Sequence, residues 1–299
     1  KVIMKIFDCF MYFDEEIVLD LRLNVLNDYV DYFVIVESTF THRGDTRKLK
    51  FNHEKFKKFE KKIVYLVYDE YPSNIEEALN DDNHDEKSRK YILNAAYREN
   101  GQRDFIINGL QNANDEDLIL VSDVDEIPNL ENLDKKNINN KIILFKQKMF
   151  YYKFNLKLPG LIWTGTKACK KKVLLSPQWL RNIKDKKYPF YRLDTIFSKK
   201  KYINIEFIDD GGWHFSNIKT AAEIQHKLKS YLHHREFDEN PMTENEINKI
   251  IKNKQAIYDL KVDKRNNKIG DGSKLENYSL DKLPKFLQNN IEKFKDWID

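Results

Sequence analysis

The chain has 299 residues, enough for one large domain or two small ones with a substantial core. A hydrophobic content of 41% and an aromatic content of 13% exclude an intrinsically disordered chain. The 52 Lys and Arg residues nearly balance 48 Asp and Glu residues, so the net charge of +4 gives no indication of a nucleic-acid-binding protein. The two cysteines, Cys9 and Cys169, exclude a disulfide framework and favour buried, reduced thiols.

No run of apolar residues is long enough for a transmembrane helix, and no secretory signal pattern is present. We therefore expect a cytoplasmic setting, and the Lys-, Asn- and Ile-rich composition suggests a microbial or viral source. The lysine runs at 170–172 and 199–201 fit solvated loops and strand edges. Contact with an anionic acceptor or peripheral contact with a membrane surface is the other interpretation of these runs.

The first half of the chain alternates apolar strand-like runs with amphipathic segments. We predict strands at 1–10, 32–36, 63–68 and 118–121, and helices at 15–30 and 88–110, the latter with a break at Asn100–Gly101. This order predicts an α/β fold with a mostly parallel sheet and crossover helices. Residues 1–130 are thus expected to form a nucleotide-binding α/β half.

The second half is richer in short strands and ends in helices. We predict strand segments at 142–154, 163–176 and 188–197, helices at 221–236 and 244–258, a loop at 263–274 and an apolar helical stripe over 283–298. Residues 131–299 are expected to bind the acceptor and to continue the same domain.

The motif Asp123-Val124-Asp125-Glu126-Ile127-Pro128 directly follows the buried strand predicted at 118–121. Open α/β sheets bind ligands at the carboxyl ends of their strands, and paired carboxylates are suitable ligands for a hard divalent cation. No glycine-rich phosphate loop is present, so a metal on Asp123 and Asp125 is the simplest way to hold a diphosphate. The alternative is that these acids are solvated loop residues.

Four segments occur in the order and rough spacing of one enzyme family. They are Phe-Asp-Cys-Phe at 7–10, Phe-Val-Ile-Val-Glu-Ser-Thr-Phe-Thr at 33–41, the acidic motif at 123–128 and Gly-Trp-His-Phe-Ser at 212–216. With Leu-Pro-Lys-Phe-Leu at 283–287, the chain resembles glycosyltransferase family 17, which includes the β-1,4-mannosyl-glycoprotein β-1,4-N-acetylglucosaminyltransferases. The resemblance implies a GT-A-type, Rossmann-like fold, a UDP-GlcNAc donor, a Mn²⁺ or Mg²⁺ ion and inversion at the anomeric carbon.

Under this resemblance, Asp123, Asp125 and the late His214 are the expected metal ligands. An isolated histidine is more often structural, but two glycines before His214 permit close backbone approach. Arg98 and Arg103 lie on the helix before the acidic strand and are expected to pair with the diphosphate, or else to form surface salt bridges.

Glu37, Ser38 and Thr39 end the second predicted strand and are expected to contact the ribose or the base of the donor. Glu37 also fits the role of a capping or loop acid. Phe7 and Asp8, placed at the end of the first strand, are expected to flank the base.

Inversion requires a general base for the attacking hydroxyl. Asp210 is the favoured candidate, with Asp209 and Glu126 as further candidates and Asp194 behind them. Trp213 and Trp163 are expected to stack on sugar rings or to lie in the core.

The resulting prediction is a metal-dependent, inverting glycosyltransferase that moves a sugar, GlcNAc by the resemblance, from a UDP-sugar to a glycan or glycoconjugate hydroxyl. The same carboxylates also fit a metal-dependent phosphohydrolase or nucleotidyltransferase. The aromatic residues and lysines also fit a non-catalytic carbohydrate- or nucleic-acid-binding protein.

Overall fold

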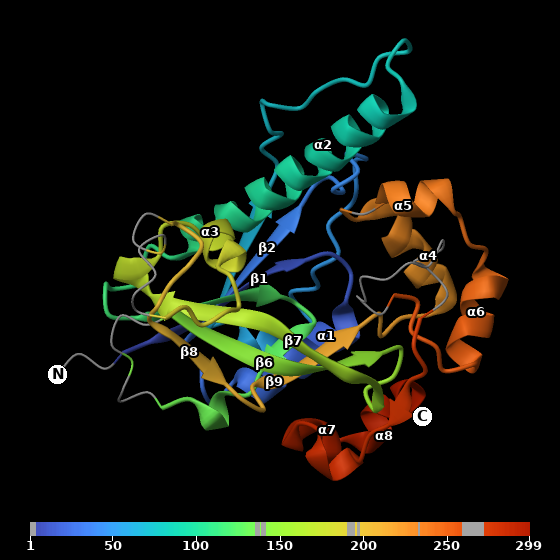
Figure 1. The fold of residues 1–299 in the computed structure, drawn as a ribbon. Helices are drawn as coiled ribbons and strands as arrows, with labels where there is room; N and C mark the ends of the chain where they lie inside the picture. Colours follow the sequence, from blue (N-terminus) through green and yellow to red (C-terminus); the bar gives the residue numbers. More distant parts are fainter. Residues whose placement is uncertain are drawn as a thin grey trace.

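The computed structural model describes residues 4–134, 138, 142–189, 195, 198–232, 234–258 and 272–299. A mixed sheet crosses the molecule, and its strands follow the order β3-β2-β1-β4-β7-β6-β9-β5 (Figure 1). Strands from both halves of the chain belong to this sheet, and helices cover both of its faces. The fold is therefore mixed α/β, as the sequence predicts, with strand order and direction that the sequence pattern leaves open.

The first half of the sheet is parallel, and its strands are β1 (Ile6–Tyr12), β2 (Tyr32–Ser38), β3 (Ile63–Tyr68) and β4 (Leu118–Asp123). The predicted strands at 32–36, 63–68 and 118–121 are confirmed. The first strand begins and ends later than the predicted 1–10, and residues 1–3 lie outside the described residues. Phe7 and Asp8 consequently lie near the start of β1, so the prediction that they end this strand is wrong.

Side chains of the parallel strands alternate between two apolar cores, as expected for a sheet buried on both faces. Phe10 and Ile35 belong to one core, whereas Cys9 and Val34 belong to the other. Helix α1 (Glu16–Leu26) covers the first face and connects β1 to β2. Helix α2 (His84–Asp104), followed by a 3₁₀ turn (Phe105–Gly109), connects β3 to β4, and this 3₁₀ turn packs into the second core.

Helix α2 is continuous, so the predicted break at Asn100–Gly101 is wrong. Gly101 has a packing role within the helix, because a Cβ atom there would lie 2.2 Å from the hydroxyl oxygen of Tyr68. The glycine lets α2 approach the last residue of β3 closely, and this contact outweighs the low helix propensity of glycine.

The second half adds β5 (Glu126–Pro128), β6 (Ile142–Tyr151), β7 (Leu156–Lys170), β8 (Ile205–Ile208), β9 (Gly212–Ser216) and β10 (Glu276–Asn277). Strand β7 is antiparallel to both β4 and β6, which makes the sheet mixed. The predicted strand at 142–154 is confirmed as far as Tyr151, and the strand signals at 163–176 fall within β7 as far as Lys170. Of the predicted strand at 188–197, Tyr188 and Pro189 are irregular, and residues 190–194, 196 and 197 lie outside the described residues.

The remaining helices are α3 (Pro177–Asn182), α4 (Ala221–Ser230), α5 (His234–Glu239), α6 (Glu244–Lys252), α7 (Lys285–Gln288) and α8 (Ile291–Phe294). Shorter 3₁₀ segments are Lys57–Phe59, Leu130–Asn132, Lys171–Val173, Leu280–Lys282 and Lys295–Trp297. The helix predicted at 221–236 is thus two helices, and the one predicted at 244–258 ends at Lys252. Most of the predicted loop at 263–274 lies outside the described residues.

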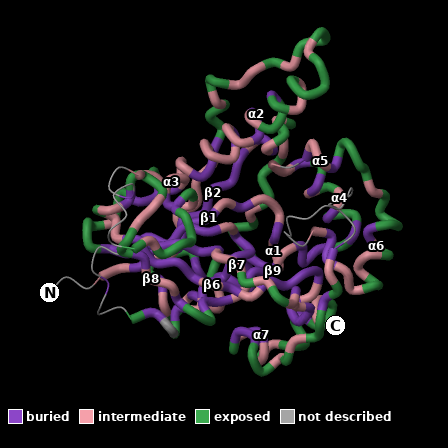
Figure 2. The backbone as a smooth tube through the Cα atoms, viewed as in Figure 1, coloured by how far each residue is buried: buried purple, intermediate pink, exposed green. Residues whose placement is uncertain are grey.

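Helices α4, α5 and α6 pack together at one side of the sheet, where they share a third apolar core with β6 and β7 (Figure 1). Helices α7 and α8 pack into the α1 side of the sheet. Burial follows this layering, since the strands are mostly buried and the exposed residues lie mainly on the outer helices and connections (Figure 2). In the part of the chain that the structure describes, no helix is both long and apolar enough to cross a bilayer.

Candidate active site

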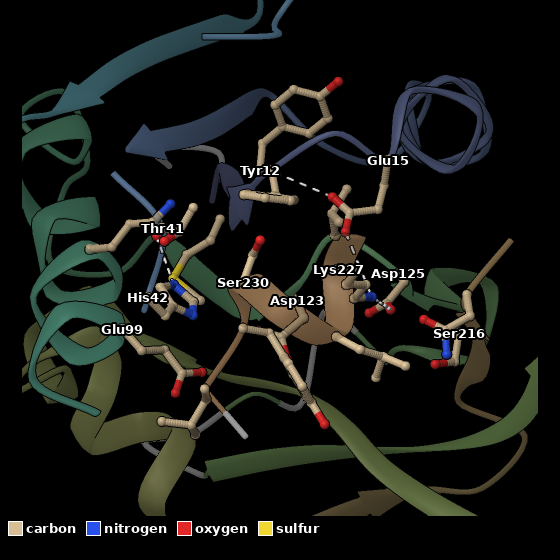
Figure 3. Close-up of a pocket in the computed structure, with 18 of the residues that line it drawn as sticks. Tyr12, Glu15, Thr41, His42, Glu99, Asp123, Asp125, Ser216, Lys227 and Ser230 are labelled. Atoms are coloured by element: carbon tan, nitrogen blue, oxygen red, sulfur yellow. Dashed lines mark hydrogen bonds and ion pairs between the residues drawn. The ribbon is translucent and has the colours of Figure 1, made fainter. Parts of the chain in front are cut away.

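A cavity of about 380 Å³ opens at the carboxyl ends of β1, β2 and β4 (Figure 3). This is the edge at which parallel α/β sheets bind ligands, because the strands end there and polar loop residues converge. The second half of the chain completes the cavity with residues from β6, β7, β9, α4, α5 and the segment after α6. Polar lining residues include Glu15, Ser38, Thr41, His42, Arg47, Glu99, Gln102, Asp123, Asp125, His214, Lys227 and Glu236.

The side chain of Asp123 faces this cavity and is held by two arginines. Its Oδ1 lies 3.0 Å from Nη2 of Arg103 on α2, and its Oδ2 lies 3.2 Å from Nη2 of Arg181 on α3. Burial alone would raise the pKa of this carboxyl group, but the two guanidinium groups hold the pKa of Asp123 far below its ordinary range. Asp123 is therefore ionised, and 40% of its side chain remains exposed.

Asp125 pairs with a histidine and a lysine from distant parts of the chain. Its Oδ1 lies 3.4 Å from Nε2 of His214, and its Oδ2 lies 3.8 Å from Nζ of Lys227 on α4. The antiparallel pairing of β5 with β9 sets this arrangement, because it aligns Glu126 with His214. The N–H of Phe215 also donates to the carbonyl oxygen of Asp125 at 2.8 Å.

Asp125 and His214 shift each other's pKa in the directions expected of an ion pair. Burial alone would raise the pKa of Asp125, but the neighbouring His214 holds it below its ordinary value. Burial alone would lower the pKa of His214, but the Asp125 carboxylate raises it above its ordinary value.

Glu126 is fully buried, and its carboxylate stabilises the acidic turn through hydrogen bonds. Its Oε2 accepts hydrogen bonds from the N–H of Asp123 at 2.9 Å and from Arg181 at 2.7 Å. Its Oε1 accepts from the Trp163 indole N–H at 2.7 Å and from Arg181 at 3.0 Å. Glu126 lies behind the cavity wall rather than in it, and this position does not suit the general-base role predicted for it. Trp163 lines the cavity beside His214.

The Asp125 carboxylate and the His214 imidazole are donor types that bind divalent cations, and substrate oxygens would have to complete the coordination of such an ion. Among the described residues, no group of three or more His, Cys, Asp or Glu side chains is arranged to hold a metal. Mg²⁺ commonly takes only one or two protein ligands and fills its remaining positions with water and substrate phosphates. Asp123 differs from this pair, because both of its oxygens are bound to arginines. The metal role of all three residues stays a prediction.

The predicted donor-contacting residues at the end of β2 separate into two environments. Ser38 lines the cavity. Glu37 is fully buried, and it accepts hydrogen bonds from Arg47 and from the N–H groups of Lys50 and Phe51 at 2.9, 2.6 and 3.0 Å. Glu37 thus holds the loop after β2 in place, which fits the alternative of a loop acid. Thr39 is not among the residues that line the cavity.

The two predicted phosphate-binding arginines both bind residues that line the cavity. Arg98 donates to the carbonyl oxygens of His42 and Arg43 at 3.0 and 2.9 Å, so it fixes the loop beside the cavity. Arg103 is 5% exposed and bonds Glu99 at 2.8 Å as well as Asp123. Both arginines are buried, so neither forms the surface salt bridge given as the alternative. Contact of either arginine with a diphosphate stays a prediction.

Phe7 and Asp8 are fully buried and do not line the cavity. Asp8 forms a fully buried ion pair with Arg22 of α1, with Oδ1 2.6 Å from Nη2. Phe7 stacks on Tyr32 with ring centroids 4.8 Å apart. The structure therefore does not bring these two residues to the position expected of groups that flank a base.

Asp209 and Asp210 precede β9, at the opposite end of that strand from Ser216, which lines the cavity. Their carboxylates are largely exposed and pair with Lys146 and Lys148. Their position at the wrong end of β9 does not suit the predicted general-base role. Trp213 likewise lies outside the cavity, where its indole N–H donates to the carbonyl oxygen of Lys282 at 3.3 Å. Asp194 lies outside the described residues.

Among the cavity and supporting residues that sequence reasoning missed are Arg181, Lys227, Glu15, His42 and Glu236. Lys227 lies between two carboxylates, 3.8 Å from Asp125 and 3.7 Å from Glu15. Glu15 also accepts hydrogen bonds from the N–H groups of Phe13 and Asp14 at 3.3 and 3.1 Å. The only sequence signal for Glu15 is its place just after the first strand. Arg181 and Lys227 reach the site through tertiary packing and carry no local signal.

Comparison with known proteins places this site in an enzyme family. The family model of glycosyltransferase family 17 matches residues 1–298. Over 229 residues, the chain is 24% identical to the beta-1,4-mannosyl-glycoprotein 4-beta-N-acetylglucosaminyltransferase of Homo sapiens, and equally to those of Rattus norvegicus and Mus musculus. These alignments cover 71% of this chain but only 40% of each relative. The match along nearly the whole chain shows that this protein is a glycosyltransferase and belongs to glycosyltransferase family 17.

Proposed function

We propose that this protein is a metal-dependent, inverting glycosyltransferase of GT-A type that transfers GlcNAc from UDP-GlcNAc to a hydroxyl group of a glycan or glycoconjugate. The observation that carries the proposal is the convergence of Asp125 and His214 at the cavity, at the carboxyl edge of the sheet. The three mammalian relatives are N-acetylglucosaminyltransferases by name, which supports GlcNAc as the transferred sugar.

Asp125 and His214 are the residues that would hold Mn²⁺ or Mg²⁺. The bound ion would neutralise charge on the departing diphosphate. Lys227 adds a fixed positive charge beside Asp125, and Arg103 and Arg181 keep Asp123 ionised at the cavity. Together these groups stabilise an anionic donor in a partly enclosed site, where electrostatic interactions are stronger than in water.

The general base must lie in the cavity and carry a carboxylate that can reach the acceptor hydroxyl. Besides the Asp123–Asp125 turn and the Glu99–Arg103 pair, the lining carboxylates are Glu15 and Glu236. Glu236 comes from α5, within the half of the chain that we expect to bind the acceptor. We therefore assign the base role to Glu236.

The test is a thermal-shift and transfer assay with UDP-GlcNAc in the presence and absence of Mn²⁺. A ligand at 100 times its Kd stabilises the folded state by about 2.7 kcal/mol, so specific binding is readily measured. We expect stabilisation by UDP-GlcNAc only with Mn²⁺, and its loss in Asp125→Asn. Asp209→Asn, an exposed acid outside the cavity, is the matched control.

Phosphodiesters and free glycans in the same assay separate the other functions. Hydrolysis of a phosphodiester without sugar transfer would indicate a phosphohydrolase. Glycan binding that is unaffected by EDTA and by Asp125→Asn would indicate a carbohydrate-binding protein. Either result, together with no response to any UDP-sugar, would contradict the proposed transfer reaction.

A further inference from the structure

Thr41 and His42 form one end of the cavity, on the side away from Asp125 and Lys227 (Figure 3). Both belong to the loop after β2, and neither has a role in the mechanism described above. The hydrogen bonds around them fix which atoms remain free to bind a ligand.

The tautomer of His42 follows from a chain of hydrogen bonds through the sheet. The carbonyl oxygen of Val36 can only accept, and it receives a bond of 3.0 Å from Nε2 of Gln102. The amide oxygen of Gln102 must therefore point the other way, toward Nε2 of His42 at 3.1 Å. Because that oxygen also only accepts, Nε2 of His42 carries a hydrogen.

The other ring nitrogen of His42 is consequently a hydrogen-bond acceptor. Burial lowers the pKa of His42, so the imidazole is neutral near pH 7 and Nδ1 keeps its lone pair. Within the described residues, the ring forms no hydrogen bond besides the one to Gln102. Nδ1 of His42 can therefore accept a hydrogen bond from a ligand in the cavity.

Thr41 supplies the complementary group. Its Oγ1 accepts hydrogen bonds from the N–H groups of Gly44 and Asp45 at 3.2 and 3.1 Å. Both lone pairs are thereby used, and the hydroxyl hydrogen donates to no acceptor in the described part of the chain. Arg98 holds the same loop through the carbonyl oxygens of His42 and Arg43, so the donor and acceptor are preorganised.

We propose that Thr41 and His42 recognise the imide edge of a uracil base and select uridine over cytidine nucleotides, a role that rests on the proposed function. On uracil, a carbonyl acceptor adjoins the N3–H donor, which matches the Thr41 hydroxyl and His42 Nδ1. On cytosine, N3 is itself an acceptor, so two lone pairs would meet at His42. A site built to hydrogen-bond one partner rejects the analogue that lacks the matching group.

The test measures the affinities of UDP, CDP and GDP by calorimetry with Mn²⁺ present. His42→Phe keeps a planar ring but removes the acceptor, and His42→Asn restores an acceptor near the Nδ1 position. We expect UDP affinity to fall about tenfold in His42→Phe with CDP affinity unchanged, and to recover partly in His42→Asn. Thr41→Val should weaken UDP binding in the same way, whereas Thr41→Ser should not.

Gln102→Glu tests the tautomer itself. A carboxylate facing Nε2–H favours the doubly protonated ring, which turns Nδ1 into a donor. The ratio of UDP to CDP affinity should therefore fall further than in His42→Phe, because CDP binding improves. Thermal unfolding of each variant verifies that it is folded before its affinities are compared.

The results separate this inference from the proposed function. If UDP binds the wild type with Mn²⁺ and His42→Phe keeps the full preference for UDP over CDP, the assignment of His42 is wrong and the proposed function stands. Tighter binding of GDP than of UDP would overturn uracil as the base, since guanine also places a carbonyl beside an N–H. If the wild type binds no uridine nucleotide even with Mn²⁺, both proposals fail.

Discussion

The guanidinium group of Arg181 binds the buried carboxylate of Glu126 through two parallel contacts. Nη1 lies 2.7 Å from Oε2, and Nη2 lies 3.0 Å from Oε1. Arg181 also reaches Oδ2 of Asp123, so one side chain of α3 joins the supporting carboxylate to the one that faces the cavity. This pairing couples the stability of the fold to the position of the acidic turn.

Removing Arg181 should therefore cost stability as well as activity. In Arg181→Met, Glu126 loses both guanidinium contacts in a fully buried position, and breaking such a pair costs about 3–5 kcal/mol. Urea unfolding measures this loss in the free energy of unfolding. Adding Glu126→Gln should recover part of the lost stability, because the uncompensated charge is removed.

The control is Lys172→Met, which breaks an exposed ion pair with Glu116 and should change stability little. Equal stability of Arg181→Met and the wild type would contradict the importance of the Arg181–Glu126 pair.

Metal affinity should rise with pH in a window set by His214. The pKa of His214 is raised above its ordinary value, and a protonated ring cannot bind a metal. Protons thus compete with the metal below this pKa, and affinity for Mn²⁺ increases as the pH passes upward through it. Titration of Mn²⁺ binding from about pH 6 to about pH 9 measures the effect. His214→Gln should bind more weakly and lose most of the pH dependence, and a flat profile in the wild type would argue against His214 as a ligand.

Gly101→Ala should destabilise the protein although alanine is the better helix former. The new methyl group would meet the Tyr68 hydroxyl at 2.2 Å, and Tyr68 is only 4% exposed, so its ring has little room to move. Overpacking of this kind costs about 1–3 kcal/mol. Thermal unfolding should show a lower Tm for Gly101→Ala and recovery on adding Tyr68→Phe, which removes the clashing oxygen. Greater stability of the single variant would show that propensity outweighs packing here.

Replacing a carboxylate by the matching amide should lower activity for an acid in the cavity but not for an acid outside it. Asp210→Asn should leave kcat/KM within about twofold of wild type, since Asp210 lies at the far end of β9. The asparagine also suits the positive φ of 48° at this position. Glu236→Gln should lower kcat strongly with a small effect on KM. A large loss in Asp210→Asn would return the base role to the position first predicted from sequence.

The parallel strands and the acidic turn could be predicted because their signals are local. The apolar run Leu118–Val121 is long enough for a buried strand, and two acids follow it directly. The same local reasoning predicts a break at Asn100–Gly101, which is wrong because contact of Gly101 with Tyr68 decides the structure there. Propensity describes the chain alone, and packing between elements overrides it.

The rest of the site depends on contacts that sequence spacing does not reveal. Lys227 is one of several charged residues on an amphipathic helix, and only the tertiary packing of α4 directs it to Asp125. Asp210 lies only four residues before His214 in sequence. It precedes β9, however, whereas His214 lies in the middle of that strand and lines the cavity. His42 had a usable signal, since it follows a buried strand in a short polar run.

The pairing of β5 with β9 has a consequence for how the enzyme acquires its activity during synthesis. Asp125 is made early, but its partners His214 and Lys227 come about ninety residues or more later in the chain. A nascent polypeptide that has completed β1 to β4 therefore still lacks both partners of Asp125. Catalytic competence is expected to arise in one late step, when the strand that bears His214 joins the sheet and the helix bearing Lys227 closes beside it.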